Sequence, residues 1–227
     1  MFVKVFFNDC KSIKMSKNHS SFPITHIKTY SKSLMGDLHT PMGIYLRLRD
    51  QFRDTVLLES TDHHVGENSF SFIAVNAIAG IEVRNFEEYE IKFPVEAPQK
   101  LQFKKGEKLT DFLHQFSQSF QCETPKNPIE KMAQGFFGYT SFDAIPFFEN
   151  IQLKPQSQEV EIPLLRYRLY QYVIAINHFN DEMFLIENKI EGLKSESLLI
   201  EDLILHKNIA VFPFESLDDE TSNLTDS

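Results

Sequence analysis

Several residue types are scarce in this sequence, and each scarcity excludes a class of site. The two cysteines, Cys10 and Cys122, form neither a CxxC metal motif nor a disulfide framework. Glycine contributes only 8 of the 227 residues, and no GxxxxGK(S/T), GxGxxG or GxSxG motif occurs. The sequence therefore offers no phosphate loop, no dinucleotide fingerprint and no hydrolase elbow. Tryptophan is absent, so indole emission from a mixture with this chain can come only from an added ligand.

Basic residues are also in the minority, and the histidines form no ligand pattern. The chain has 23 Lys and Arg against 32 Asp and Glu, a net charge of -9 and a pI near 5.4. Nucleic acid is therefore not an expected partner, because phosphate binding requires clustered basic side chains. His63 and His64 would point to opposite faces of a strand, and no other pair of histidines has helical i, i+4 spacing. We expect no metal site built by this chain.

Long hydrophobic runs are missing as well. No apolar stretch approaches the roughly 20 residues of a membrane-spanning helix, and the opening Phe2–Phe7 is too short for a signal peptide. Hydrophobic residues make up 42% and charged residues 24%, which is ordinary for a globular chain. We therefore expect a cytoplasmic protein with no membrane partner.

Hydrophobic periodicity predicts mostly strands, with helices between them at long intervals. Helices are predicted from Thr40-Pro41, where a capping hydroxyl precedes a first-turn proline, over the aromatic stripe Leu109–Phe120, and over Leu193–Ile204. Strands are predicted at 22–27, 55–58, 69–75, 81–83, 89–93, 135–139, 165–176 and 182–187. Residues 55–58 with 69–75, and 165–176 with 182–187, read as hairpins. The fold class predicted is α+β, with largely antiparallel sheet and packed helices.

Several short motifs occur in a fixed order along the chain. They are Asp37–Pro41, Tyr45–Leu48, Leu57–Ser60, Ser71–Ile73, Gly135–Tyr139 with Asp143 and Glu149, and Pro163–Ile176 ending at His178. Each motif alone is weak, but together they resemble the amino-terminal region of anthranilate synthase component I, in the chorismate-utilising enzyme family. The resemblance covers nearly the whole chain from about Thr25 onward.

The resemblance implies a division of the chain. Residues 1–21 would be a poorly specified leader and residues 22–214 the amino-terminal domain. Residues 215–227 would begin a carboxy-terminal catalytic domain that this sequence does not contain. Thr221–Ser227 end on capping-type residues, which fits either a helix start or a polar tail.

The same resemblance implies what the chain does. The enzyme converts chorismate and ammonia or glutamine to anthranilate and pyruvate, a carbon–carbon lyase step that opens tryptophan biosynthesis. Chorismate and magnesium bind the carboxy-terminal domain, so the resemblance implies no catalytic residue and no cofactor in this chain, which alone would be inactive. Its partners would be its own catalytic domain, a glutamine amidotransferase subunit that supplies ammonia, and L-tryptophan as feedback inhibitor.

Five residues are implied to line the tryptophan site: Ser60 in direct contact, Leu58 and Glu59 beside it, and Phe70 and Ser71 on the facing strand. Their chemistry suits a zwitterion with an apolar side chain. Ser60 and Glu59 can accept hydrogen bonds from an ammonium group, and the leucines can form an apolar slot. From spacing alone, Leu57 and Leu58 would equally be core residues and Glu59 a solvated charge.

Two alternatives remain open at the level of sequence. The amino-terminal region of aminodeoxychorismate synthase component I shares the family fold, although Thr40-Pro41, Tyr45–Leu48 and the intact Leu57–Ser60 favour anthranilate synthase. A stand-alone amino-acid-binding module would need a closed pocket within the chain.

Overall fold

The computed structural model describes residues 2–6, 22–59, 69–103, 108–151 and 162–205. Its strands, in chain order, are β1 (Phe2–Phe6), β2 (Thr25–Met35), β3 (Val56–Leu58), β4 (Phe70–Val83), β5 (Glu88–Lys92), β6 (Gln99–Gln102), β7 (Phe120–Cys122), β8 (Gly135–Thr140), β9 (Leu165–Asn177) and β10 (Glu182–Lys189). Its helices are α1 (Pro41–Arg49), α2 (Leu109–Gln118), α3 (Pro128–Lys131), the 3-10 helix η1 (Phe142–Phe147) and α4 (Ser197–Leu205).

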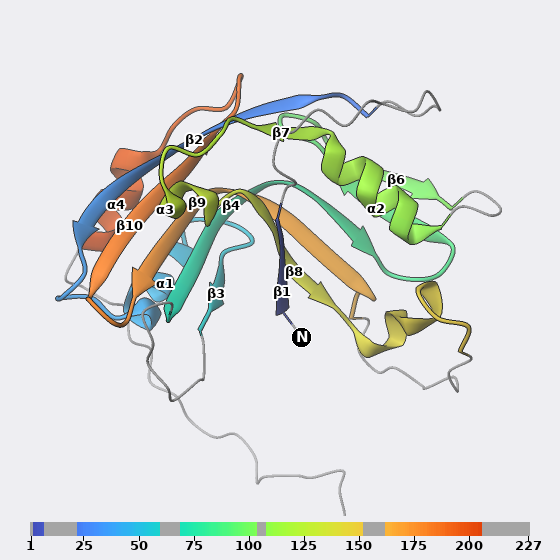
Figure 1. The fold of residues 1–227 in the computed structure, drawn as a ribbon, viewed down its shortest axis with the longest axis horizontal. Coiled ribbons are helices and arrows are strands. Elements are labelled where there is room, and N and C mark those ends of the chain that lie inside the picture. Colours follow the sequence, from blue (N-terminus) through green and yellow to red (C-terminus); the bar gives the residue numbers. More distant parts are fainter. Residues whose placement is uncertain (1, 7–21, 60–68, 104–107, 152–161, 206–227) are drawn as a thin grey trace, which may run out of the picture.

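The strands form a single arched sheet built on β4 and β9 (Figure 1). The main path runs β6-β5-β4-β9-β10-β2-β7, while β3 pairs with β4, and β8 pairs with both β9 and β1. Every pairing is antiparallel except that of β2 with β7. The predicted α+β class with a largely antiparallel sheet is therefore confirmed.

The two long strands bend together near Asn76. Asn76 has a left-handed backbone, with φ of 62°, and the register of β4 against β9 shifts between Ala77 and Ala79. The Asn76 side chain donates a 2.7 Å hydrogen bond to Gln171 of β9, and the buried Gln171 donates in turn to the Lys194 carbonyl at 2.9 Å. A bulge increases local twist and redirects a strand. The bend divides the arch into two limbs, and both β4 and β9 have one end in each of them.

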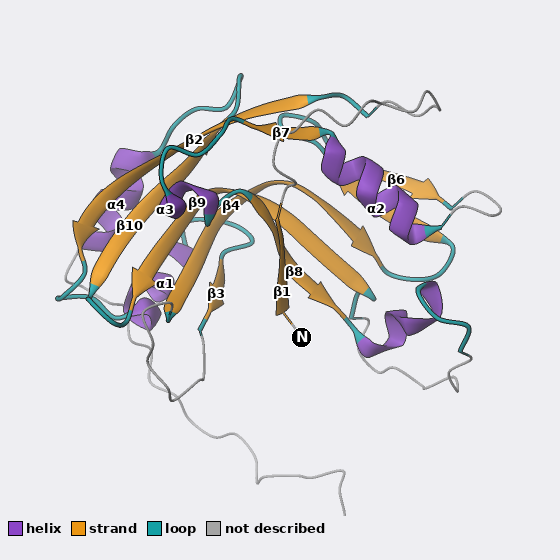
Figure 2. Ribbon diagram, viewed as in Figure 1, coloured by secondary structure: helices purple, strands orange, loops and turns teal. Residues whose placement is uncertain are grey.

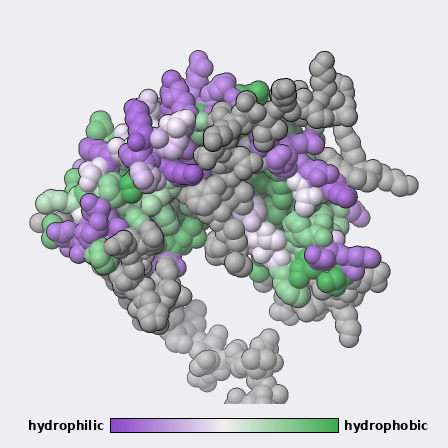
Figure 3. Space-filling view, viewed as in Figure 1, coloured by the Kyte–Doolittle hydropathy of each residue, from purple (hydrophilic) through white to green (hydrophobic). Residues whose placement is uncertain are grey.

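Helices cover both limbs (Figure 2). On one limb, α2 buries Phe112 and Phe116 against residues of β4, β5, β8 and β9. On the other, α1 and α4 bury Ile44 and Ile200 against alternate residues of β4, β9 and β10. We call the sheet surface under α1 and α4 the helix face. Hydrophobic residues also border the hollow of the arch in the space-filling view (Figure 3).

The opposite surface of that limb carries a third apolar cluster. It includes Phe70, Phe72 and Ala74 of β4, whereas Ile73 and Val75 belong to the helix face. This alternation follows from the two-residue period of a strand. We call this second surface the Phe72 face.

Local signals in the sequence account for most element positions. Thr40 caps α1, its hydroxyl accepting a hydrogen bond from the Gly43 N–H at 3.1 Å, as predicted. The two predicted hairpins also form, β3 with β4 and β9 with β10.

Some boundaries differ from the prediction. Phe120 lies in β7 rather than in the helix, because α2 is capped at Ser119, whose hydroxyl donates to the Phe116 carbonyl at 2.6 Å. The last helix begins at Ser197 rather than Leu193, after Gly192 at φ of 83°. Residues 2–6, for which no element is predicted, form β1 through pairing with β8. Residues 7–21 and 215–227 lie outside the described residues.

The helices of the described residues are all short, and the longest, α2, has 10 residues. None combines the length and the apolar character needed to span a membrane.

Substitution of Asn76 tests the bend. Asn76→Ala is expected to lower the free energy of unfolding by about 2–3 kcal/mol, because alanine disfavours the left-handed backbone and removes the bond to Gln171. Asn76→Gly keeps the backbone accessible and removes only the side chain, so its loss should be smaller, near 1 kcal/mol. Urea unfolding measures both. Equal losses in the two variants would contradict a left-handed requirement at this position.

Candidate functional site

The described members of the predicted site, Leu58, Glu59, Phe70 and Ser71, lie at one end of the paired strands β3 and β4. Leu58 of β3 pairs with Phe72 of β4, and Glu59 follows directly as an exposed residue. Ser60, the residue predicted to contact tryptophan, lies outside the described residues. Within the described part of the chain, β3 pairs with β4 alone, so its other edge is open. An open strand edge presents backbone donors and acceptors to a ligand.

Leu58 and Phe70 lie together on the Phe72 face. Both pack against its apolar cluster as half-buried side chains. The Phe70 and Phe72 rings stack with centroids 5.9 Å apart, and Phe72 contacts the Phe137 ring at 6.4 Å. These side chains form an apolar surface beside Glu59.

Ser71, in contrast, lies on the helix face and is fully buried. Its Oγ is 2.7 Å from Nε2 of His178, the residue that follows β9, and the His178 N–H donates to the Ser69 carbonyl at 2.9 Å. The structure thus divides the described members of the predicted set. Leu58 and Phe70 share one face, Ser71 lies on the other, and Glu59 follows the end of β3 as an exposed residue.

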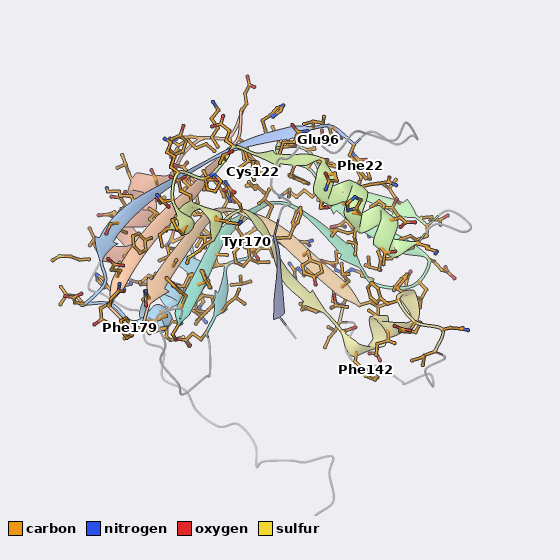
Figure 4. The ribbon with its side chains drawn as sticks, viewed as in Figure 1. Phe22, Glu96, Cys122, Phe142, Tyr170 and Phe179 are labelled. Carbon is orange, nitrogen blue, oxygen red and sulfur yellow. The ribbon has the colours of Figure 1, made fainter. Side chains whose placement is uncertain are left out.

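His178, where the last motif of the family resemblance ends, was given no predicted role at this edge. Its partner Ser71 is 107 positions away, so no spacing rule could connect them. The neighbouring Asn177 side chain accepts a hydrogen bond from the Phe179 N–H at 2.9 Å and closes the turn into β10. Figure 4 shows Phe179 at this end of the sheet, well apart from Tyr170.

A buried carboxylate organises the other limb. Glu82 of β4 lies 2.6 Å from an Arg84 nitrogen, 2.7 Å from Arg168 and 3.5 Å from Arg166. Its side chain is only 5% exposed, so the guanidinium groups supply the partners that a buried charge needs. This cluster was not predicted, because its members come from two distant strands.

Arg166 links the Glu82 cluster to the predicted site. It lies 2.5 Å from Asp54, a left-handed residue with φ of 57° two positions before β3. The ion pair therefore fixes the chain where it enters β3. Burial, followed by the nearby Asp54 carboxylate, raises the pKa of Tyr170 well above its usual range.

Among the residues that the structure describes, no three His, Cys, Asp or Glu side chains lie close enough to hold a metal ion.

Comparison of the sequence with protein-family models and with curated proteins gives no match. The functional reading therefore depends on the motifs and on the geometry of the β3–β4 edge.

A double-mutant cycle tests the link between Ser71 and His178. Ser71→Ala and His178→Ala should each destabilise the fold, and their interaction energy should be about 1 kcal/mol, the net worth of one hydrogen bond. Urea unfolding gives the four free energies. Ser33→Ala, an exposed serine of β2, serves as the control and should change little. Strict additivity of the two losses would argue against this contact.

Proposed function

We propose that this chain is the regulatory, amino-terminal part of an anthranilate synthase component I and that its β3–β4 edge contributes to an L-tryptophan feedback site. The observation that carries the proposal is the juxtaposition at the end of β3. The apolar surface of Leu58, Phe70 and Phe72 ends there, and the chain continues directly into the exposed residue Glu59. The ordered motifs of the sequence support the choice of family.

The chemistry of an amino-acid ligand fits this edge. In the proposal, the indole ring lies against the apolar surface and the ammonium group pairs with Glu59. The open edge of β3 supplies backbone N–H donors for the carboxylate. Charge-assisted hydrogen bonds of this kind are about twice as strong as neutral ones.

In the proposal, tryptophan regulates the enzyme through the connection between β3 and the rest of the sheet. Through Asp54 and Arg166, the start of β3 is tied to Glu82 on the other limb. Tryptophan bound here would favour an inactive arrangement of the amino-terminal and catalytic domains, and such couplings are typically about 1–3 kcal/mol. Chorismate and magnesium are assigned to the catalytic domain, and ammonia to the amidotransferase subunit.

Ligand fluorescence tests the site directly, because the chain has no tryptophan. L-Tryptophan emission should shift saturably on titration with the chain, weakly if the catalytic domain completes the site. Glu59→Gln keeps an acceptor but removes the negative charge, so it should weaken binding by up to about tenfold, the scale of one exposed ion pair. Glu96→Gln, an exposed glutamate outside the hairpin, is the matched control.

Analogues separate the contributions of the two ligand charges. Indole-3-propionate lacks the ammonium group and should bind wild type and Glu59→Gln alike. Tight tryptophan binding by this chain alone would instead favour a stand-alone amino-acid-binding module. Unchanged affinity in Glu59→Gln would remove Glu59 from the site.

Activity provides a separate test. Incubated with chorismate, ammonia and magnesium, the 227-residue chain should form no anthranilate, because the proposal assigns the reacting groups to the catalytic domain. Anthranilate fluorescence is the readout, and an active anthranilate synthase assayed in parallel shows that the conditions support turnover. Anthranilate formation above the protein-free rate would overturn this assignment.

A further inference from the structure

A cavity of about 360 Å³ lies on the limb of the arch that α2 covers. One wall is the flank of α2, and the others come from β4, β8 and β9, with Phe148 immediately after η1. None of its lining residues belongs to the β3–β4 edge. The cavity is therefore a separate feature from the proposed tryptophan site.

Three phenylalanine rings form part of the cavity wall. Phe116 and Phe136 are buried and lie 5.4 Å apart by ring centroid, while Phe148 is 45% exposed. Aliphatic side chains of α2, β4 and β9 complete the apolar lining. Such a surface favours a flat, apolar ring, because aromatic pairs gain from offset or edge-to-face contact beyond their burial.

One polar pair lies in this apolar lining. Thr140 Oγ1 and the Tyr167 hydroxyl are 3.1 Å apart. When one hydroxyl donates to the other, the pair still has a hydrogen available to an additional acceptor and lone pairs available to a donor. The Ser117 hydroxyl, also in the lining, donates to the His114 carbonyl at 2.8 Å within its own helix. The Thr140–Tyr167 pair is thus the group best placed to orient a ligand.

The lining also constrains ligand charge. Among the described residues, the lining contains no Asp, Glu, Lys or Arg, and its one imidazole, His114, is an exposed residue of α2. An ionised group deep in the cavity would therefore lose its water without gaining an adjacent counter-ion. The volume is at the lower end of the range for small-molecule sites, about 300–1,000 Å³. A single or fused ring is the matching size.

We propose that this cavity binds a small neutral aromatic molecule that carries one hydrogen-bonding group, of the phenol class, with that group directed at Thr140 and Tyr167. This inference is independent of the tryptophan site. Fluorine NMR of the intact chain tests it with 4-fluorophenol as the probe. The probe's signal should broaden and shift saturably.

Two related probes report on polarity and charge. 4-Fluorotoluene, which lacks the hydroxyl, should bind roughly three- to tenfold more weakly, the range that one neutral hydrogen bond provides. 4-Fluorobenzoate, which is anionic at neutral pH, should show no saturable binding. Equal binding of all three probes would overturn the proposal, as would the absence of saturable binding by 4-fluorophenol.

Variants locate the binding. Ser117→Phe places a ring in the cavity and should abolish binding of 4-fluorophenol, whereas Gln118→Phe adds the same ring at the adjacent exposed position and should not. Tyr167→Phe changes little volume and should reduce the preference for 4-fluorophenol over 4-fluorotoluene, because only the Thr140 hydroxyl remains to bond the probe. Retained binding in Ser117→Phe, or an unchanged preference in Tyr167→Phe, would place the probe elsewhere. If Ser117→Phe does not fold, the Tyr167→Phe comparison decides the matter alone.

Excess L-tryptophan distinguishes this cavity from the β3–β4 edge. It should leave the 4-fluorophenol signal unchanged, because the two sites share no residue. Displacement by tryptophan would mean that the probe occupies the edge and would contradict a second site.

Discussion

The pairing of β4 with β9 is the constraint on which the rest of the structure depends. These strands of 14 and 13 residues run through both limbs of the arch, and every cluster of the core includes residues from both. A straight ladder of this length would give one flat sheet. The left-handed Asn76 and its bond to Gln171 bend it, so one pair of strands supports two helix-covered limbs.

Sequence patterns predicted an element correctly where neighbouring residues along the chain determine its structure. The hydroxyl and proline of Thr40-Pro41 locate the start of α1, and the apolar runs around Asn177–Asp181 locate a hairpin. They failed to predict an element where its structure depends on pairing with a strand far away in the sequence. Phe120 continues the helical stripe of α2, but β2 recruits it into β7 by parallel pairing with Thr25. Asn76 sits inside an apolar run, and its bend depends on a glutamine of another strand.

The candidate site shows the same limit. Leu58, Glu59 and Phe70 could be proposed from motifs along the chain, and the hairpin that brings their strands together could be predicted. The separation of Phe70 and Ser71 onto opposite faces follows from strand alternation. His178 and the Glu82 cluster could not be predicted, because their partners become neighbours only through the antiparallel β4–β9 register. Family motifs can identify candidate site residues, but the register of the paired strands determines which of these residues come into contact.

The Arg166 side chain gives the arch two connections that differ in their exposure to solvent. Its partner Asp54 is 42% exposed, whereas its other partner, Glu82, is 5% exposed and also held by Arg168. Dissolved salt screens exposed charges far more than buried ones. Rising ionic strength should therefore weaken the Asp54–Arg166 ion pair just before β3, whereas the ion pairs of the buried Glu82 should persist. The connection between the β3–β4 hairpin, which carries Glu59, and the other limb should therefore weaken as the salt concentration of the solution rises.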